Sequence, residues 1–125
     1  MIGPIYERTD AKGFVRAFRI EDRHTNGRGV LHGGMLMAFA DIVLAQAGIL
    51  AGAGPAATVR IATEFIAPGR LGEWVEGRAQ VSRRTRSLIF TQGDISVGDR
   101  PLMTASGIFM MVGGCGAGAN VSDAR

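Results

Sequence analysis

Cysteine and lysine are nearly absent from this chain of 125 residues, since each occurs only once. The single cysteine, Cys115, can form no disulfide within the chain and no cysteine-based metal cage. This composition suits the reducing cytosol, where we expect the protein to reside. We also expect no metal site, because His24 and His32 have no carboxylate at a spacing typical of zinc ligands. The net charge of +3 is too small to predict binding to a nucleic acid, but it suits a small phosphorylated ligand.

One stretch, residues 33–52, is long and apolar enough to resemble a membrane span. Only Asp41 and Gln46 are polar within it. A carboxylate near the middle of a span costs roughly 2.5–3.5 kcal/mol, and no Lys or Arg stands at the C-terminal end of the stretch. We therefore predict no membrane contact, but a helix that is apolar all round because a curved sheet or a second subunit covers it. Residues 1–10 lack the basic start and apolar core of a signal peptide.

The rest of the chain is patterned like a β-sheet. Residues 58–67 and 74–83 alternate between apolar and polar side chains, which is the period of a strand. Residues 102–112 are apolar on both faces, as in a central strand. We expect strands at residues 14–20, 58–67, 74–83, 87–97 and 102–112, the last four forming a meander. One long helix with an antiparallel sheet makes an α+β domain over residues 1–112. The Gly/Ala-rich residues 113–125 are expected to form a flexible tail.

The residues that could take part in a reaction lie just before the predicted helix and inside it. Gly33 and Gly34 at the helix start let the backbone approach a ligand closely. The first N–H groups of a helix have no intrahelical partner and carry the positive end of its dipole, so they suit an oxyanion or a polarised carbonyl. Asp41, placed among apolar neighbours, is a candidate general base or nucleophile.

Each of these residues also has a purely structural interpretation. Asn26 and Gly27 form a favoured tight-turn pair, and His32 can be a structural hydrogen-bonding histidine. The two glycines can serve packing, and Asp41 can satisfy a buried backbone group or an interface partner. The combination is harder to explain by structure alone, because His32 follows Asn26 by six positions and Asp41 is the only charge on the helix.

This combination resembles the hotdog-fold acyl-CoA thioesterases of the phenylacetate-degradation and 4-hydroxybenzoyl-CoA type. The resemblance covers roughly residues 25–112, and the family fold, a long central helix wrapped by an antiparallel sheet, agrees with the element order above. The matching residues are Asn26, Gly29, His32, Gly33, Gly34, Asp41, the stretch 65–68 and Gly72.

The resemblance implies a role for each matching position. Asp41 would activate water or attack the thioester, the N–H of Gly33 would polarise the thioester carbonyl, and Gly34 would contact the substrate. Asn26 would hold the carbonyl or the water, and His32 would position the thioester. Thr58 corresponds to a hydroxyl that orients the water or the carboxylate, although strand threonines are also common for packing reasons.

The resemblance further implies an acyl-CoA substrate with a small or medium, aromatic or aliphatic acyl group, and no separate cofactor. It implies a homodimer, or two dimers paired as a homotetramer, in which one subunit supplies Asp41 and Thr58 and the other supplies the loop before the helix. Two groups of residues are candidates for substrate contacts. Arg83, Arg84 and Arg86 suit the phosphates of coenzyme A, or form a solvated hairpin end. The acyl pocket is expected beside Met37 and Phe65, with Met35 and Phe39, although methionine at helical spacing is also typical of a core.

Two other functions stay open. One is a hotdog-fold dehydratase or hydratase that acts on acyl chains, and the other is a non-catalytic module that binds acyl-CoA. The presence of Asp41 favours catalysis over simple binding. Cys115 has no local base and is not expected to act as a nucleophile, and His24 is expected to lie in a solvated loop.

Overall fold

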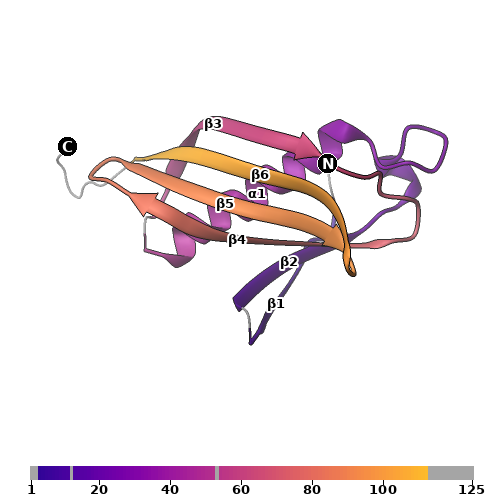
Figure 1. Ribbon diagram of the computed structural model, residues 1–125, viewed down its shortest axis with the longest axis horizontal. Helices are drawn as coiled ribbons and strands as arrows, with labels where there is room; N and C mark the ends of the chain where they lie inside the picture. The colour runs from indigo at the N-terminus through magenta and orange to yellow at the C-terminus, as the bar shows by residue number, and fades with distance from the viewer. Residues whose placement is uncertain (1–2, 12, 53, 113–125) are drawn as a thin grey trace.

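The computed structural model describes residues 3–11, 13–52 and 54–112 and shows one helix lying against one sheet (Figure 1). The strands pair antiparallel in the order β1-β2-β4-β5-β6-β3. This is the predicted α+β arrangement. In chain order the elements are β1 (Tyr6–Asp10), β2 (Gly13–Arg19), the 3-10 helix η1 (Asp22–His24), α1 (Gly33–Leu50), β3 (Ala56–Phe65), β4 (Trp74–Arg84), β5 (Leu88–Val97) and β6 (Arg100–Met111).

The sheet differs from the sequence-based expectation in two respects. Strand β1 was not predicted, because its YERTD sequence has no apolar alternation and its residues are largely exposed. The predicted four-strand meander is wrong. Strands β4, β5 and β6 are consecutive neighbours, but β3 pairs with β6 at the far edge. The alternation of a strand reveals its two faces but not its partner, so this order was not readable from the pattern.

Helix α1 supplies one side of the core, and it ends at Leu50, two residues before the predicted end. Its side chains Phe39 and Val43 lie against β4. A Cβ atom at Gly77 would come within 2.7 Å of Val43 Cγ2 and 3.0 Å of Phe39 Cε2, so glycine is what permits this close approach. By length and composition α1 could pass for a membrane span. Seven of its residues are instead buried within the domain: Leu36, Phe39, Ala40, Val43, Leu44, Ala47 and Gly48.

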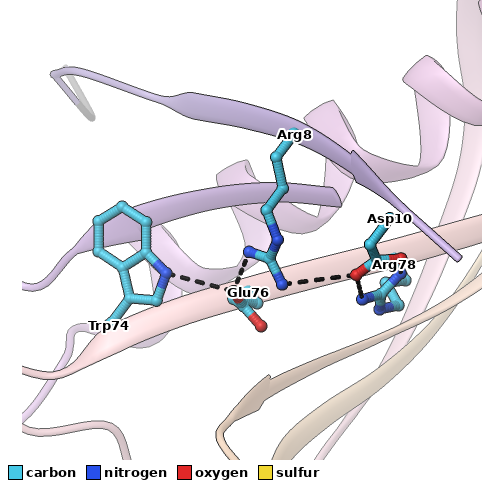
Figure 2. A network of polar contacts seen from close by, with 5 residues as sticks. All are labelled: Arg8, Asp10, Trp74, Glu76 and Arg78. Carbon is cyan, nitrogen blue, oxygen red and sulfur yellow. Dashed lines mark hydrogen bonds and ion pairs between the residues drawn. The ribbon is translucent and has the colours of Figure 1, made fainter. Parts of the chain in front are cut away.

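The face of β2 that points away from α1 is covered by charged side chains rather than by a second layer of helices or strands. Phe18 contacts Phe39 of α1, so the neighbouring Ala17 faces away from the helix, yet Ala17 and Val15 are buried. Charged residues of β1 and β4 pair with one another across this face of β2, as Figure 2 shows. The ion pairs therefore shield these apolar residues and hold β1 on the sheet. They join Arg8 to Glu76, Arg78 to Asp10, and Arg8 to Asp10.

We expect this network to weaken in acid. The hydrogen bond from Arg8 holds the pKa of Glu76 below its ordinary value of 4.5. A carboxylate with a lowered folded-state pKa contributes stability above its ordinary pKa and loses it as the pH falls through the folded-state value. The stability advantage of the wild type over Glu76→Gln should therefore be largest near neutral pH and shrink below about pH 4.5. Denaturant unfolding of both proteins across this range measures it, and a constant difference would contradict it.

Candidate active site

The segment that leads into α1 is held by backbone hydrogen bonds to the loop between β3 and β4. Leu31 N–H donates to the Gly69 carbonyl at 2.7 Å, and Leu71 N–H donates to the Gly29 carbonyl at 2.8 Å. The segment before α1 is therefore fixed against the loop between β3 and β4, although neither segment belongs to a named strand.

Glu73 in turn fixes the loop between β3 and β4. Its carboxylate accepts a hydrogen bond from Arg70 N–H at 2.7 Å and one from the Arg100 guanidinium at 2.5 Å. The Arg100 contact is the main reason that the pKa of Glu73 lies below its ordinary value. Arg100 also donates to the Pro68 carbonyl at 3.3 Å, so one arginine holds the loop at two points.

The start of α1 leaves one backbone donor available. His32 is the N-cap, and its Nδ1 accepts a hydrogen bond from Gly34 N–H at 3.0 Å. Gly33 is the first helical residue, and none of residues 3–11, 13–52 and 54–112 accepts a hydrogen bond from its N–H. This N–H lies at the positive end of the helix dipole, where a carbonyl oxygen that gains negative charge is stabilised.

Asp41 lies two turns further along α1 and contacts the predicted hydroxyl. Thr58 Oγ1 donates to Asp41 Oδ1 at 3.1 Å, which joins the helix to β3. Asp41 is partly buried, and Thr58 is exposed in the single chain. A hydroxyl and a carboxylate in contact can share and orient a water molecule, as general-base chemistry requires.

A β-bulge at Val59 turns Thr58 toward the helix. Thr58 pairs with Phe109 and Arg60 pairs with Ile108, so the register shifts between them. Phe109 is buried in the core, which places Thr58 on the helix side and Arg60 on the opposite face. Without the bulge, residues two apart would share a face. The alternation read from the sequence did not reveal this insertion.

The helix start and Asp41 of one chain do not meet. Eight residues separate Gly33 from Asp41, which is about 12 Å along a helix axis. One thioester cannot touch both groups of the same subunit, because hydrogen-bonded atoms lie within roughly 3 Å of each other.

Asn26 adopts the turn geometry that its sequence favours. Its Oδ1 accepts a hydrogen bond from Arg28 N–H at 2.9 Å, and Gly27 has a φ of 88°. The side-chain oxygen therefore serves the turn. The amide N–H groups are the donors that Asn26 can offer to a carbonyl or a water, as the predicted role requires.

The three arginines at the end of β4 do not form one cluster. A bulge at Ser82 places Arg83 opposite Phe90 and Arg84 opposite the buried Ile89, so the two side chains leave opposite faces of the sheet. Arg84 donates to the Ala51 carbonyl at 3.0 Å and thus caps the negative end of α1. Arg83 and Arg86 are exposed.

An apolar groove of about 310 Å³ lies between the helix start and the end of β3. Gly33 and Phe65 both line it, but Met37 is exposed elsewhere on α1. The expectation that Phe39 lines an acyl pocket is wrong, because Phe39 is fully buried against Phe18. Met35 is partly buried against the core. The lining residues are Val30, Leu31, Gly33, Leu36, Phe65, Ile66, Ala67, Pro68 and Gly69.

Two further sequence-based expectations concern His24 and Cys115. His24 is 1% exposed rather than solvated, because η1 turns its ring inward against Phe18. Cys115 and the predicted tail lie outside the described residues. Within the part of the chain that the structure describes, no three His, Cys, Asp or Glu residues could share a metal ion.

Comparisons with known proteins agree with this architecture. A family model described as the thioesterase superfamily matches residues 28–104. The chain is 32% identical over 112 residues to a protein of Pseudomonas aeruginosa named as an esterase, covering 87% of this chain and 84% of that protein. It is 30% identical over 79 residues to acyl-coenzyme A thioesterase 13 of Homo sapiens, covering 62% of this chain and 56% of that protein.

Solved structures share the fold. A hypothetical thioesterase from Streptococcus pneumoniae, solved with coenzyme A, superposes with a TM-score of 0.76 at 17% identity, covering 88% of this chain and 87% of that one. The family model spans more than half of the chain, and the long helix on an antiparallel sheet matches the structures of this family. The chain therefore belongs to the thioesterase superfamily and has its hotdog fold.

Proposed function

We propose that this protein hydrolyses the thioester of a small or medium acyl-CoA to a free acid and coenzyme A. One observation carries the proposal: a helix start with an available Gly33 N–H stands on the same helix as a carboxylate, Asp41, that is held by Thr58. The first group suits the carbonyl oxygen and the second suits the attacking water.

The proposed reaction needs little apparatus. A thioester is more electrophilic than an ester or an amide, and its thiolate leaves without a strong acid. Asp41 takes a proton from the attacking water or itself attacks the carbonyl carbon, and Gly33 N–H donates a hydrogen bond to the carbonyl oxygen as this oxygen gains negative charge. The C–S bond then breaks and releases the thiolate of coenzyme A. His32 caps the helix by accepting the N–H of Gly34, and so holds the first N–H groups of α1 in place. The reaction as proposed uses no separate cofactor.

The active site is proposed to lie between two subunits. Strand β3 is an edge strand with one unpaired side, and an edge of this kind is a ready surface for pairing with a second copy. Large exposed apolar side chains lie on β3 and on α1 beside it, namely Val59, Phe65 and Met37. A two-fold pairing of β3 edges would bring the helix start of one subunit toward Asp41 of the other. Two such dimers are further proposed to pair into a tetramer.

The names of similar proteins support the same substrate class. The human relative is named an acyl-coenzyme A thioesterase, and the bacterial neighbours include structures with coenzyme A and with acetyl CoA. The proposed place of action is the cytosol, in keeping with the single cysteine of the chain.

The direct test is release of free thiol from a series of acyl-CoA esters of varied length and aromaticity. We expect thiol release from at least one small or medium ester. Hydration of an enoyl-CoA without thiol release would favour the dehydratase alternative. Saturable binding of acyl-CoA with neither reaction would favour the binding module. Either result would overturn the proposed hydrolysis.

Mixed dimers test the shared site. A dimer that pairs one Asp41→Asn subunit with one Gly33→Pro subunit should contain one intact site and one doubly defective site. Purified with two affinity tags, this heterodimer should show about half of the wild-type activity, whereas both mutant homodimers should be nearly inactive. A heterodimer as inactive as its parents would mean that each site is built within one chain.

The exposed arginines provide a test of coenzyme A recognition. Arg83→Ala combined with Arg86→Ala should raise KM for acyl-CoA esters and spare pantetheine thioesters, which lack the nucleotide phosphates. Arg84→Ala should instead lower the melting temperature, because its guanidinium caps α1 at Ala51. Steady-state kinetics with both substrate types measures the first effect. Equal losses with both types would exclude phosphate recognition by these arginines.

A further inference from the structure

The imidazole of His24 is buried, but the proposed mechanism assigns it no role. Its Nδ1 accepts a hydrogen bond from the backbone N–H of Glu21 at 2.9 Å, so this nitrogen carries no proton in the observed arrangement. The ring meets Phe18 edge-on, with centroids 5.3 Å apart at 85°. Phe18 in turn contacts Phe39 of α1 at 4.7 Å between centroids. The ring therefore connects η1 to the core beneath the helix.

The backbone of His24 connects the same turn to the proposed site. Its carbonyl accepts the N–H of His32 at 2.8 Å. His32 is the N-cap of α1, and the peptide unit that follows it carries the Gly33 N–H. Reciprocal hydrogen bonds between Glu21 and His24 close η1 and so fix the direction of the His24 carbonyl. The orientation of the Gly33 N–H thus depends, through His32, on the conformation of this turn.

We propose that His24 is a positioning residue, whose buried imidazole fixes η1 and thereby aims the Gly33 N–H at the thioester carbonyl. This inference rests on the proposed hydrolysis, because it concerns the alignment of one donor with the reacting carbonyl. A contact that strengthens only in the transition state contributes to kcat rather than to ground-state affinity. Loss of the His24 acceptor therefore lowers kcat and leaves KM nearly unchanged.

Two variants isolate the acceptor atom. In His24→Asn, the side-chain oxygen is bonded to Cγ, as Nδ1 is in histidine, and it can accept from Glu21 N–H. In His24→Gln, the oxygen lies one bond further out and misses this position. Both variants lose the ring contact with Phe18, so the difference between them reports on the hydrogen bond. Phe18→Leu is the packing control, because it loosens the same contact and leaves the polar atoms of η1 in place.

We expect His24→Gln to lower kcat by about tenfold or more at a similar KM, because a small displacement of a catalytic contact is costly. His24→Asn should recover most of kcat, and Phe18→Leu should lower the melting temperature without lowering kcat. Equal kcat values for His24→Asn and His24→Gln, or failure of His24→Asn to fold, would overturn the proposal.

Hydrogen exchange separates this inference from the proposed function. The amide of His32, which donates to the His24 carbonyl, should exchange faster in His24→Gln than in His24→Asn. This measurement needs no substrate. If the wild type releases no thiol from any ester, the proposed hydrolysis fails, and the exchange rates still decide whether His24 fixes the helix start. Equal exchange rates in the two variants would overturn the positioning role.

Discussion

Replacing Asp41 by asparagine should lower the kcat for thioester hydrolysis at least about 100-fold, as removal of a general base commonly does. Asparagine has the same shape, and its Oδ1 can still accept the hydrogen bond from Thr58 that is 3.1 Å long in the wild type. The variant should therefore keep its fold and its melting temperature. Only the capacity to take a proton or to attack the carbonyl is removed.

Thr58→Val is the matched comparison for this substitution. It removes the hydroxyl and retains both the shape of the side chain and the charge of Asp41. If Thr58 only orients the carboxylate or its water, the loss of kcat should be smaller than for Asp41→Asn. Steady-state thiol release, measured beside thermal unfolding, gives both effects. Unchanged turnover in a folded Asp41→Asn variant would remove this carboxylate from the mechanism.

Replacing Gly33 by proline should remove the proposed donor to the thioester carbonyl without disturbing the helix. Proline has no N–H, and it is favoured at the first position of a helix, where the N–H has no helical partner. The preceding residue must be extended, and His32 already has φ −66° and ψ 132°. Loss of a single oxyanion donor typically costs about 10² to 10³ in kcat, and we expect that loss here.

Gly33→Ala provides the control, because it keeps the N–H and adds only one carbon atom. The new Cβ would lie 3.7 Å from Phe65 Cε1, an ordinary van der Waals distance, so its kcat should stay close to that of the wild type. Both variants should melt no earlier than the wild type, because each restricts the unfolded chain more than glycine does. Equal activities of Gly33→Pro and Gly33→Ala would show that this N–H does not serve the reaction.

The helix and its start were predictable because their signals are local. A long apolar stretch interrupted by Asp41 predicted a covered helix, and the paired glycines predicted its start. The contact between Asp41 and Thr58 came only from the resemblance to a known family. The helix spacing alone gave no reason to bring these two residues together, since one lies on α1 and the other on β3.

The features that could not be predicted from the sequence depend on single-residue irregularities and on long-range pairing. The bulges at Val59 and Ser82 reverse the alternation of β3 and β4, and they turn Thr58 and Arg84 toward the helix side. Neither bulge has a glycine or proline beside it that would mark it in the sequence. The order of strands was also hidden, because β3 pairs with the last strand rather than the next one. His24 looked solvated because its neighbours are polar, and only the packing of η1 on Phe18 buries it.

The open edge of β3 also has a consequence for how the protein would behave in a cell. If two copies must meet along this edge to complete a site, the abundance of the protein itself controls its output, by mass action. Diluted below the dissociation constant of the pair, the chains would lose their activity. The activity per molecule would then rise with expression level, so the amount of protein in the cell would regulate the activity without a regulatory ligand.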